Sequence, residues 1–298
     1  MTDKLVREAS ARMQQEINAS HILINVAADA EPKDTLAAYN RIMDLRQRAL
    51  AGENFEKLAS TYSEDPSARD NQGNLGYFTA LQMVYPFEDA AYKTPPGSLT
   101  PPVRTRFGYH LIRVNDARPA QGEIKVAHIM VRATPGMPKA DSVMAKKKID
   151  EIYARVLRKE NWDKLVSQFS EDASSAENGG ELPWFGTGRM IASFEEAAFR
   201  LANPGDISRP VLTPYGWHII KFLERRTLAP YEDMEPSLRS RVAKDSRSEL
   251  NKAALLKRIK AETIFRSWPP PNPMPWARLT PLCSAAPGKT GIPPTKPG

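Results

Sequence analysis

The hydrophobic pattern of the chain opens with a helical period. Residues 2–18 place apolar side chains along one stripe and charged side chains elsewhere, which predicts an amphipathic helix. The stripe consists of Leu5, Val6, Ala9 and Met13. From His21 to Val26 the pattern changes to a continuous aliphatic run, short enough for a buried strand. Because an isolated helix of this length is marginal in water, we expect it to pack on another element.

The next residues predict one unit with its own helices and strands. A helix starts at Pro32 and ends before Gly52, and Asn54 caps a second, shorter helix. Turn-forming residues over 63–67 then end the helical pattern. The remaining expected elements are an extended stretch over 75–78, a short helix over 86–92, a loop with a brief strand over 95–102 and a last strand over 109–114.

The same pattern returns further along the chain. The run over 21–24, His-Ile-Leu-Ile, reappears over 128–131 as His-Ile-Met-Val. Later positions keep an offset of 107 residues, which becomes 108 after an insertion near Asn203. A period of this length indicates a duplicated globular domain, since solenoid repeats are about 20–50 residues long. We predict a first copy over residues 19–117, a linker over 118–123 and a second copy over 124–226.

Two helical segments and a tail flank the copies. Residues 1–18 and 227–265 are predicted to be helical, the latter through a Lys- and Arg-rich stretch from Glu232 to Glu262. From Trp268 onwards lie ten of the 26 prolines without any periodicity, so no core can form there. We predict a disordered Pro-rich tail over 266–298 and assign it no function.

Charge and cysteine content narrow the possible functions. Four basic residues of the tail account for four of the +7 net charge and leave +3, so we predict no nucleic-acid partner. The single cysteine, Cys283, excludes an intrachain disulfide and a thiolate metal cluster. No apolar run approaches the ~18 residues of a membrane span. Residues 1–11 lack the apolar core of a signal peptide, so we expect a truncated or processed start.

The four histidines occupy matching positions of the two copies. They are His21 and His110 in the first copy and His128 and His218 in the second. Such placement of a scarce residue indicates a paired-histidine site that occurs twice. The alternative is that each histidine is a satisfied core residue at a strand end. We predict neither a metal nor a cofactor, because zinc usually needs further Cys, His or carboxylate ligands in a recognisable cluster.

Ordered motifs around these histidines resemble the parvulin-type peptidyl-prolyl cis/trans isomerases. An aromatic-Ser-Glu-Asp run over 62–65 and 169–172 precedes a Gly-x-Leu-x-aromatic-Phe run over 73–78 and 180–185. A Met, a Phe-Glu-acidic-Ala-Ala run and a closing Gly-aromatic-His strand complete the pattern in both copies. Two such copies after a helix resemble the layout of SurA-type envelope chaperones, with residues 2–18 as what remains of their amino-terminal domain.

The resemblance implies an α+β fold, in which helices cover a small antiparallel sheet in each copy and the first and last strands are adjacent. His21 would then meet His110, and His128 would meet His218. Further residues of this network, by resemblance, are Asp65 and Thr105 in the first copy and Asp172 and Thr213 in the second. The implied proline pockets consist of Leu75, Met83 and Phe87, and of Leu182, Met190 and Phe194.

Both copies depart from the family pattern beside the pocket. The first copy has Gln72-Gly73 where Gly-Gly is usual, and the second has Pro183 where glycine is usual. The spacing of Met83 and Phe87, four residues apart, is also typical of plain core packing. The loop geometry beside each pocket therefore does not follow from the resemblance alone.

The resemblance implies isomerisation of prolyl bonds, which needs no nucleophile because it only twists a tertiary amide over ~20 kcal/mol. The implied partners are unfolded or nascent proline-containing polypeptides, and the implied location is the periplasm or cell envelope. The rival hypothesis is a non-catalytic chaperone or scaffold whose pockets only hold peptide. A prolyl isomerase assay on each copy separates the two hypotheses.

Overall fold

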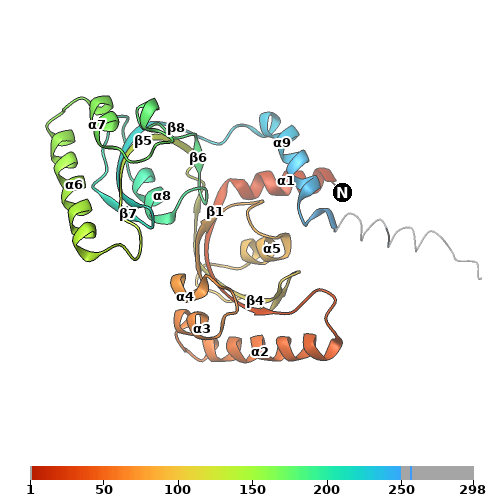
Figure 1. Cartoon of the computed structure of the whole chain (residues 1–298). Helices are drawn as coiled ribbons and strands as arrows, with labels where there is room; N and C mark the ends of the chain where they lie inside the picture. Colours follow the sequence, from red (N-terminus) through yellow and green to blue (C-terminus); the bar gives the residue numbers. More distant parts are fainter. Residues whose placement is uncertain (1, 250–255, 257–298) are drawn as a thin grey trace, which may run out of the picture. The chain divides into compact units, whose positions relative to one another are not determined.

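The structure, a computed structural model, describes residues 2–249 and residue 256 (Figure 1). Each copy forms a four-stranded antiparallel sheet, in the orders β2-β1-β4-β3 and β6-β5-β8-β7. The strands are β1 (Gln15–Asn25), β2 (Asn74–Phe78), β3 (Val103–Arg104), β4 (Gly108–Pro119), β5 (Glu123–Arg132), β6 (Phe185–Gly186), β7 (Val211–Thr213) and β8 (Gly216–Arg226). These sheets and their covering helices confirm the α+β class.

Helices pack on both faces of each sheet. The first copy contains α2 (Pro32–Leu50), α3 (Phe55–Tyr62), α4 (Ala68–Asn71) and α5 (Tyr85–Lys93). The second copy contains α6 (Lys139–Leu157), α7 (Trp162–Phe169), the 3-10 turn η1 (Ala176–Asn178) and α8 (Ala192–Phe199). The predicted cap is confirmed, since Asn54 accepts a hydrogen bond from the N–H of Lys57 at 2.7 Å. No helix within the described residues is long and apolar enough to cross a membrane.

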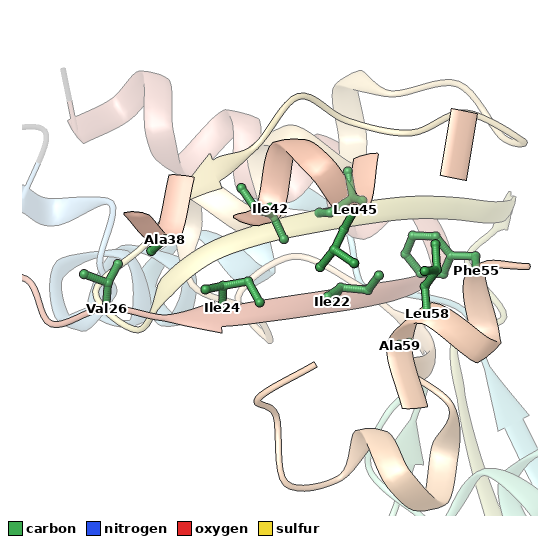
Figure 2. Close-up of a cluster of buried hydrophobic side chains, with 10 residues drawn as sticks. Ile22, Ile24, Val26, Ala38, Ile42, Leu45, Phe55, Leu58 and Ala59 are labelled. Carbon is green, nitrogen blue, oxygen red and sulfur yellow. The ribbon is translucent and has the colours of Figure 1, made fainter. Parts of the chain in front are cut away.

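The pleat of β1 separates an apolar core from the candidate site. Successive side chains of a strand point to opposite faces. Ile22 and Ile24, both fully buried, pack against Ile42 of α2 and Leu58 of α3, as Figure 2 shows. Each such isoleucine contributes about 1.5–3 kcal/mol by leaving water. His21 therefore points to the opposite face, where α5 lies.

Adjacent central strands bring the paired histidines together. In the first copy His21 lies opposite Ile112 and Leu23 lies opposite His110, so the two histidines are diagonal neighbours on one face. Side chains at diagonal positions of antiparallel strands are within reach when they are aromatic or long. In the second copy Met130 lies opposite His218 in the same way.

Two predicted boundaries of the first copy are wrong. The helix predicted over 2–18 is α1 (Thr2–Met13), and β1 already begins at Gln15. Asn18 pairs with both Tyr77 and Asp116, so sheet pairing on two sides prevails over the helical pattern there. The linker predicted over 118–123 is shorter, because β4 runs to Pro119 and β5 starts at Glu123.

The helix α9 (Tyr231–Lys244) packs against α1. Their shared cluster contains Leu5, Val6, Ala9, Leu238 and Val242. The helical segment predicted over 227–265 is interrupted, since the backbone at Asp245 is extended, with φ −81° and ψ 158°. Residues 250–255 and 257–298, which include the predicted tail, lie outside the described residues.

Candidate functional site

The paired histidines of the first copy face each other through one nitrogen of each ring. The Nδ1 atoms of His21 and His110 lie 3.2 Å apart. The rings are nearly parallel, with an interplanar angle of 17° and centroids 5.5 Å apart. Both side chains are buried, so each remaining ring nitrogen needs a partner within the protein.

A carboxylate and a hydroxyl supply these partners. His21 Nε2 lies 2.7 Å from Asp65 Oδ2, at the end of the Ser-Glu-Asp run after α3. His110 Nε2 lies 2.8 Å from Thr105 Oγ1, in the turn before β4. The structure thus joins the four first-copy residues predicted for the network in one continuous chain of hydrogen bonds.

The second copy repeats this chain almost atom for atom. His128 and His218 approach through Nδ1 at 3.1 Å. His128 Nε2 lies 2.7 Å from Asp172 Oδ2, and His218 Nε2 lies 2.9 Å from Thr213 Oγ1. The four second-copy residues predicted for the network are therefore also brought together.

The partners fix which atoms donate protons. The ionised Asp65 carboxylate only accepts, so a neutral His21 carries its single proton on Nε2 and donates it to Asp65. His21 Nδ1 then accepts the Nδ1–H of His110. His110 Nε2 is left as an acceptor for the Thr105 hydroxyl proton. The chain of hydrogen bonds runs in one direction, from threonine to aspartate.

All four histidines are held in the neutral form. Burial lowers the pKa of His21 and of His128, against the opposing effect of the neighbouring aspartate. Burial and the adjacent His21 lower the pKa of His110 to about 3. Burial and the adjacent His128 lower the pKa of His218 to about 4. When both rings of a pair are neutral, one proton lies between the two Nδ1 atoms, so one ring donates and the other accepts.

Both aspartates are held in the ionised form. Burial raises the pKa of Asp65, but hydrogen bonds from Ser67 and His21 outweigh it, so the pKa lies below its ordinary value. Burial also opposes ionisation of Asp172, where hydrogen bonds from Ser174, Ser175 and His128 prevail and lower the pKa. The hydroxyl of Ser174 donates to Asp172 Oδ1 at 2.6 Å. Each network therefore ends on a fixed negative charge.

An aromatic ring from α5 or α8 stands against each histidine pair. Phe87 meets His21 and His110 edge to face, with centroids 5.7 and 5.4 Å away. Phe194 meets His128 and His218 in the same way, at 5.8 and 5.3 Å. Edge-to-face contacts of this length are favourable. The phenylalanines predicted for the pockets thus connect each histidine pair to the apolar side of its site.

The second copy has an open pocket of about 510 Å³ beside this network. All seven second-copy site residues predicted from the sequence line it: His128, Asp172, Leu182, Met190, Phe194, Thr213 and His218. The sequence analysis missed Met130, Arg132, Thr134, Ile191 and Tyr215, which also line the pocket. In the first copy Leu75 and Met83 pack on the buried cluster that contains Phe87.

A glycine permits close approach of the loop to each histidine strand. Gly73, with φ +79°, accepts the backbone N–H of His21 at 2.8 Å. A Cβ atom there would lie 2.5 Å from the His21 carbonyl oxygen. Gly180 stands in the same relation to His128. The usual first glycine is replaced by Gln72, which adopts the left-handed conformation at φ 55°.

A buried glutamate holds the loop that carries each pocket methionine. Glu88 is fully buried and accepts the N–H of Leu81, together with the guanidinium groups of Arg12 and Arg247. Its counterpart Glu195 accepts the backbone N–H groups of residues 188–190, and no described residue forms an ion pair with it. The recurring Phe-Glu pair at 87–88 and 194–195 was the available sequence signal.

The described part of the chain contains no group of three or more His, Cys, Asp or Glu side chains arranged to hold a metal ion. The ring nitrogens are instead engaged with each other, with aspartate and with threonine. The arrangement can place oriented dipoles and one fixed charge beside an apolar pocket.

Two proteins named Chaperone SurA are similar to this chain in sequence. Chaperone SurA of Hahella chejuensis is 32% identical over 227 residues, which cover 74% of this chain and 51% of that protein. Chaperone SurA of Methylobacillus flagellatus is 30% identical over 274 residues, which cover 89% of this chain and 58% of that protein. The chain spans about half the length of the curated relatives it matches.

Solved structures of peptidyl-prolyl isomerases are also similar. The peptidylprolyl isomerase PrsA of Bacillus anthracis is 34% identical, with a TM-score of 0.32, over 45% of this chain and 61% of that one. The parvulin NmPin of Nitrosopumilus maritimus is 31% identical, with a TM-score of 0.26, over 35% of this chain and 97% of that one.

The sequence profile of the PPIC-type PPIASE domain matches the chain twice, over residues 4–118 and 115–226. Each match contains one complete sheet with its histidine pair. The chain therefore belongs to the PPIC-type, parvulin family of peptidyl-prolyl isomerase domains, of which it contains two.

Proposed function

We propose that the chain catalyses cis/trans isomerisation of the peptide bond before proline in unfolded or extended polypeptide. The observation that supports this most is the pocket of the second copy, where an apolar wall of Leu182, Met190 and Phe194 adjoins the His128–His218 network. A pyrrolidine ring is a compact apolar group, and such a wall suits it. The polar network then lies beside the bond to be twisted.

Isomerisation at a useful rate requires only a modest reduction of the activation barrier. The uncatalysed barrier of ~20 kcal/mol corresponds to roughly 0.01 events per second. Turnover near 100 per second needs a reduction of about 5 kcal/mol. Twisting removes amide resonance and its charge separation, so an apolar pocket that excludes water disfavours the planar ground state relative to the twisted state.

The hydrogen-bond network holds the dipoles of its side chains in fixed orientations beside the pocket. Its rings are neutral, its end carboxylate is charged, and every ring nitrogen has a partner, so the dipoles are fixed before substrate arrives. Preorganised dipoles lower the free energy of a twisted amide without having to rearrange during the reaction. In this proposal Asp172 acts through His128 and is a positioning residue.

The inferred clients are unfolded or nascent proline-containing polypeptides, and the inferred location is the periplasm or cell envelope. The similarity to proteins named Chaperone SurA supports the first inference. The resemblance to envelope chaperones supports the second.

One observation favours a second function, in which the pocket only binds peptide. Both ring nitrogens of His128 and of His218 are already engaged within the protein. A ring without a free nitrogen cannot form a direct hydrogen bond to the amide as it twists. Peptide would then be held by Leu182, Met190 and Phe194 without faster isomerisation.

The two functions are separated by variants of the full chain in which Phe87→Ala disables the first copy. Phe194→Ala removes a contact shared by the ground and twisted states, so we expect weaker peptide affinity and slower turnover. Asp172→Ala is expected to lower turnover at least ~10-fold while peptide affinity stays within a few-fold. Lys147→Ala, on the exposed surface of α6, is the control.

Isomerisation is measured by NMR exchange and affinity by titration on the same samples, after thermal unfolding shows that each variant is folded. If the parent chain binds proline peptides without exchange above background, the binding function replaces the isomerase. Equal turnover of Asp172→Ala and its parent would also refute the assignment of this residue.

A further inference from the structure

One difference between the two copies lies inside the hydrogen-bond network. The second copy has Ser175 where the first copy has Ala68, at the common offset of 107 residues. Ser175 is 2% exposed and Ala68 is 1% exposed, so neither side chain reaches solvent. The Ser175 hydroxyl is therefore a buried polar group that needs partners within the protein.

Both of its partners belong to the network. Ser175 Oγ lies 2.6 Å from Asp172 Oδ2 and 3.1 Å from His128 Nε2. An ionised carboxylate only accepts, so the hydroxyl donates to Asp172 and presents its lone pairs to the N–H of His128. Ser175 thus bridges two groups that also contact each other directly at 2.7 Å.

The turn itself does not need this hydroxyl. Ser175 precedes η1 but makes no side-chain cap to it. Ala68 N–H donates to Asp65 O at 3.0 Å, and Ser175 N–H donates to Asp172 O at 3.3 Å, so both copies build the same turn. The first copy forms it with alanine. The serine hydroxyl is thus an addition directed at the network.

We propose that Ser175 is a positioning residue of the second copy, which holds the Asp172 carboxylate against His128 and fixes the tautomer that donates from Nε2. In the first copy Asp65 alone selects the corresponding tautomer of His21. Because one ring sets the proton position of the other, the added constraint extends to His218. The consequence for turnover rests on the proposed isomerase function, whereas the consequence for proton position does not.

The test uses the full chain with 15N-labelled histidine, in which the four histidines are all members of the two networks. The rate at which each Nε2–H proton exchanges with water is measured by NMR. We expect His128 to exchange about 5-fold more slowly than His21, a factor that corresponds to one net hydrogen bond. Ser175→Ala should remove this difference.

Two further variants complete the design. Ala68→Ser should slow exchange at His21, because the same backbone turn would direct the new hydroxyl to Asp65. Ser174→Ala is the control, since that hydroxyl bonds only the other carboxylate oxygen, Oδ1. It should leave the His128 exchange rate within about 2-fold, because no bond to the histidine is lost.

Equal exchange rates at His21 and His128 in the parent chain would overturn the proposal. So would an unchanged His128 rate in folded Ser175→Ala. If Ser175→Ala does not fold, an unchanged exchange rate of the His21 proton in Ala68→Ser would overturn the proposal instead. If the exchange rates are as expected but the chain has no isomerase activity, the proposed function is refuted and the role of Ser175 is still supported.

Discussion

His128 and His218 meet through their Nδ1 atoms at 3.1 Å, a contact in which one ring must donate a proton and the other must accept it. Because His218 donates from Nδ1 and His128 carries its proton on Nε2, protonation of His128 would place two N–H groups against each other in this contact. The contact therefore requires a neutral His128, and in the first copy a neutral His21. Protonation and folding are consequently linked in both copies.

The first prediction concerns stability at acidic pH. The pKa values of His110, about 3, and His218, about 4, lie below the ~6.5 of an exposed histidine. Between these values the unfolded chain binds protons that the folded chain does not. Stability is thus fully present above pH ~6.5 and falls by about 1.4 kcal/mol per pH unit for each such histidine.

Urea unfolding at pH 7, 6 and 5 measures this dependence. His110→Gln and His218→Gln remove one titrating group each and should flatten the slope in the copy that carries the substitution. A free energy of unfolding that stays constant from pH 7 to 5 would show that the pairs accept protons while folded.

The second prediction concerns the threonine at the start of the network. Thr213→Val keeps the side-chain shape but leaves His218 Nε2 and the N–H of Tyr215 without their partner. Loss of a buried hydrogen-bond partner costs about 1–3 kcal/mol. Thermal unfolding should show this loss, whereas Thr213→Ser, which keeps the hydroxyl, should stay close to the parent. Equal melting temperatures for the two variants would contradict the assigned role.

The third prediction compares two glutamates at matching positions. Glu88→Gln removes the buried charge that neutralises Arg12 and Arg247, and should cost about 3–5 kcal/mol. Glu195→Gln keeps an acceptor for backbone N–H groups and breaks no ion pair among the described residues, so it should cost less, about 1–2 kcal/mol. Chemical unfolding of both variants makes the comparison. A larger loss for Glu195→Gln would refute it.

The fourth prediction compares two glycines with positive φ. A Cβ atom at Gly73 would lie 2.5 Å from the His21 carbonyl oxygen, whereas one at Gly76 would meet nothing within 4 Å. Gly76→Ala should therefore cost only the left-handed backbone penalty of about 1–2 kcal/mol. Gly73→Ala should cost more and shift the NMR signals of His21. Similar stability of the two variants would mean that the loop can move away without cost.

The fifth prediction treats the second copy as an insertion between β4 and α9. Replacement of residues 121–228 by about 15 Gly and Ser residues provides a flexible connection. We expect the remaining chain to unfold cooperatively, because the α1–α9 cluster and the first-copy sheet stay intact. Calorimetry checks this, and residues 121–228 alone should give a second cooperative transition. Loss of both transitions would place the domain boundary elsewhere.

The paired histidines were predictable from the sequence because they occupy matching places of the two copies, whereas the aspartates, the threonines and the pocket residues were assigned through the family resemblance. His21 and Asp65 lie on different elements, but their spacing of 44 residues recurs in His128 and Asp172. The repeat thus agreed with an assignment that rested on the resemblance. The helix predicted over 2–18 was wrong at its end. Nothing in the local sequence indicates that residues 15–18 pair with a strand about 100 residues away.

Other parts of the site depend on contacts that no local pattern encodes. In the sequence, Ser175 cannot be distinguished from other serines in turns. Its contact with His128 is seen only in the folded structure. Glu88 belongs to a recurring Phe-Glu pair, but that pair does not indicate that Arg12 and Arg247, from distant segments, contact the glutamate. Burial of polar groups follows from tertiary packing, so spacing along the chain could not reveal it.

The pairing of α1 with α9 also sets an order of events during synthesis. About 200 residues separate the two helices, and ribosomes add about 5–20 residues per second, so α9 emerges roughly 10–45 s after α1. All strands of both sheets are made in that interval. Leu5, Val6 and Ala9 meanwhile lack Leu238 and Val242. A nascent chain with two finished sheets therefore still displays an open apolar stripe, available to whatever apolar surface it meets first.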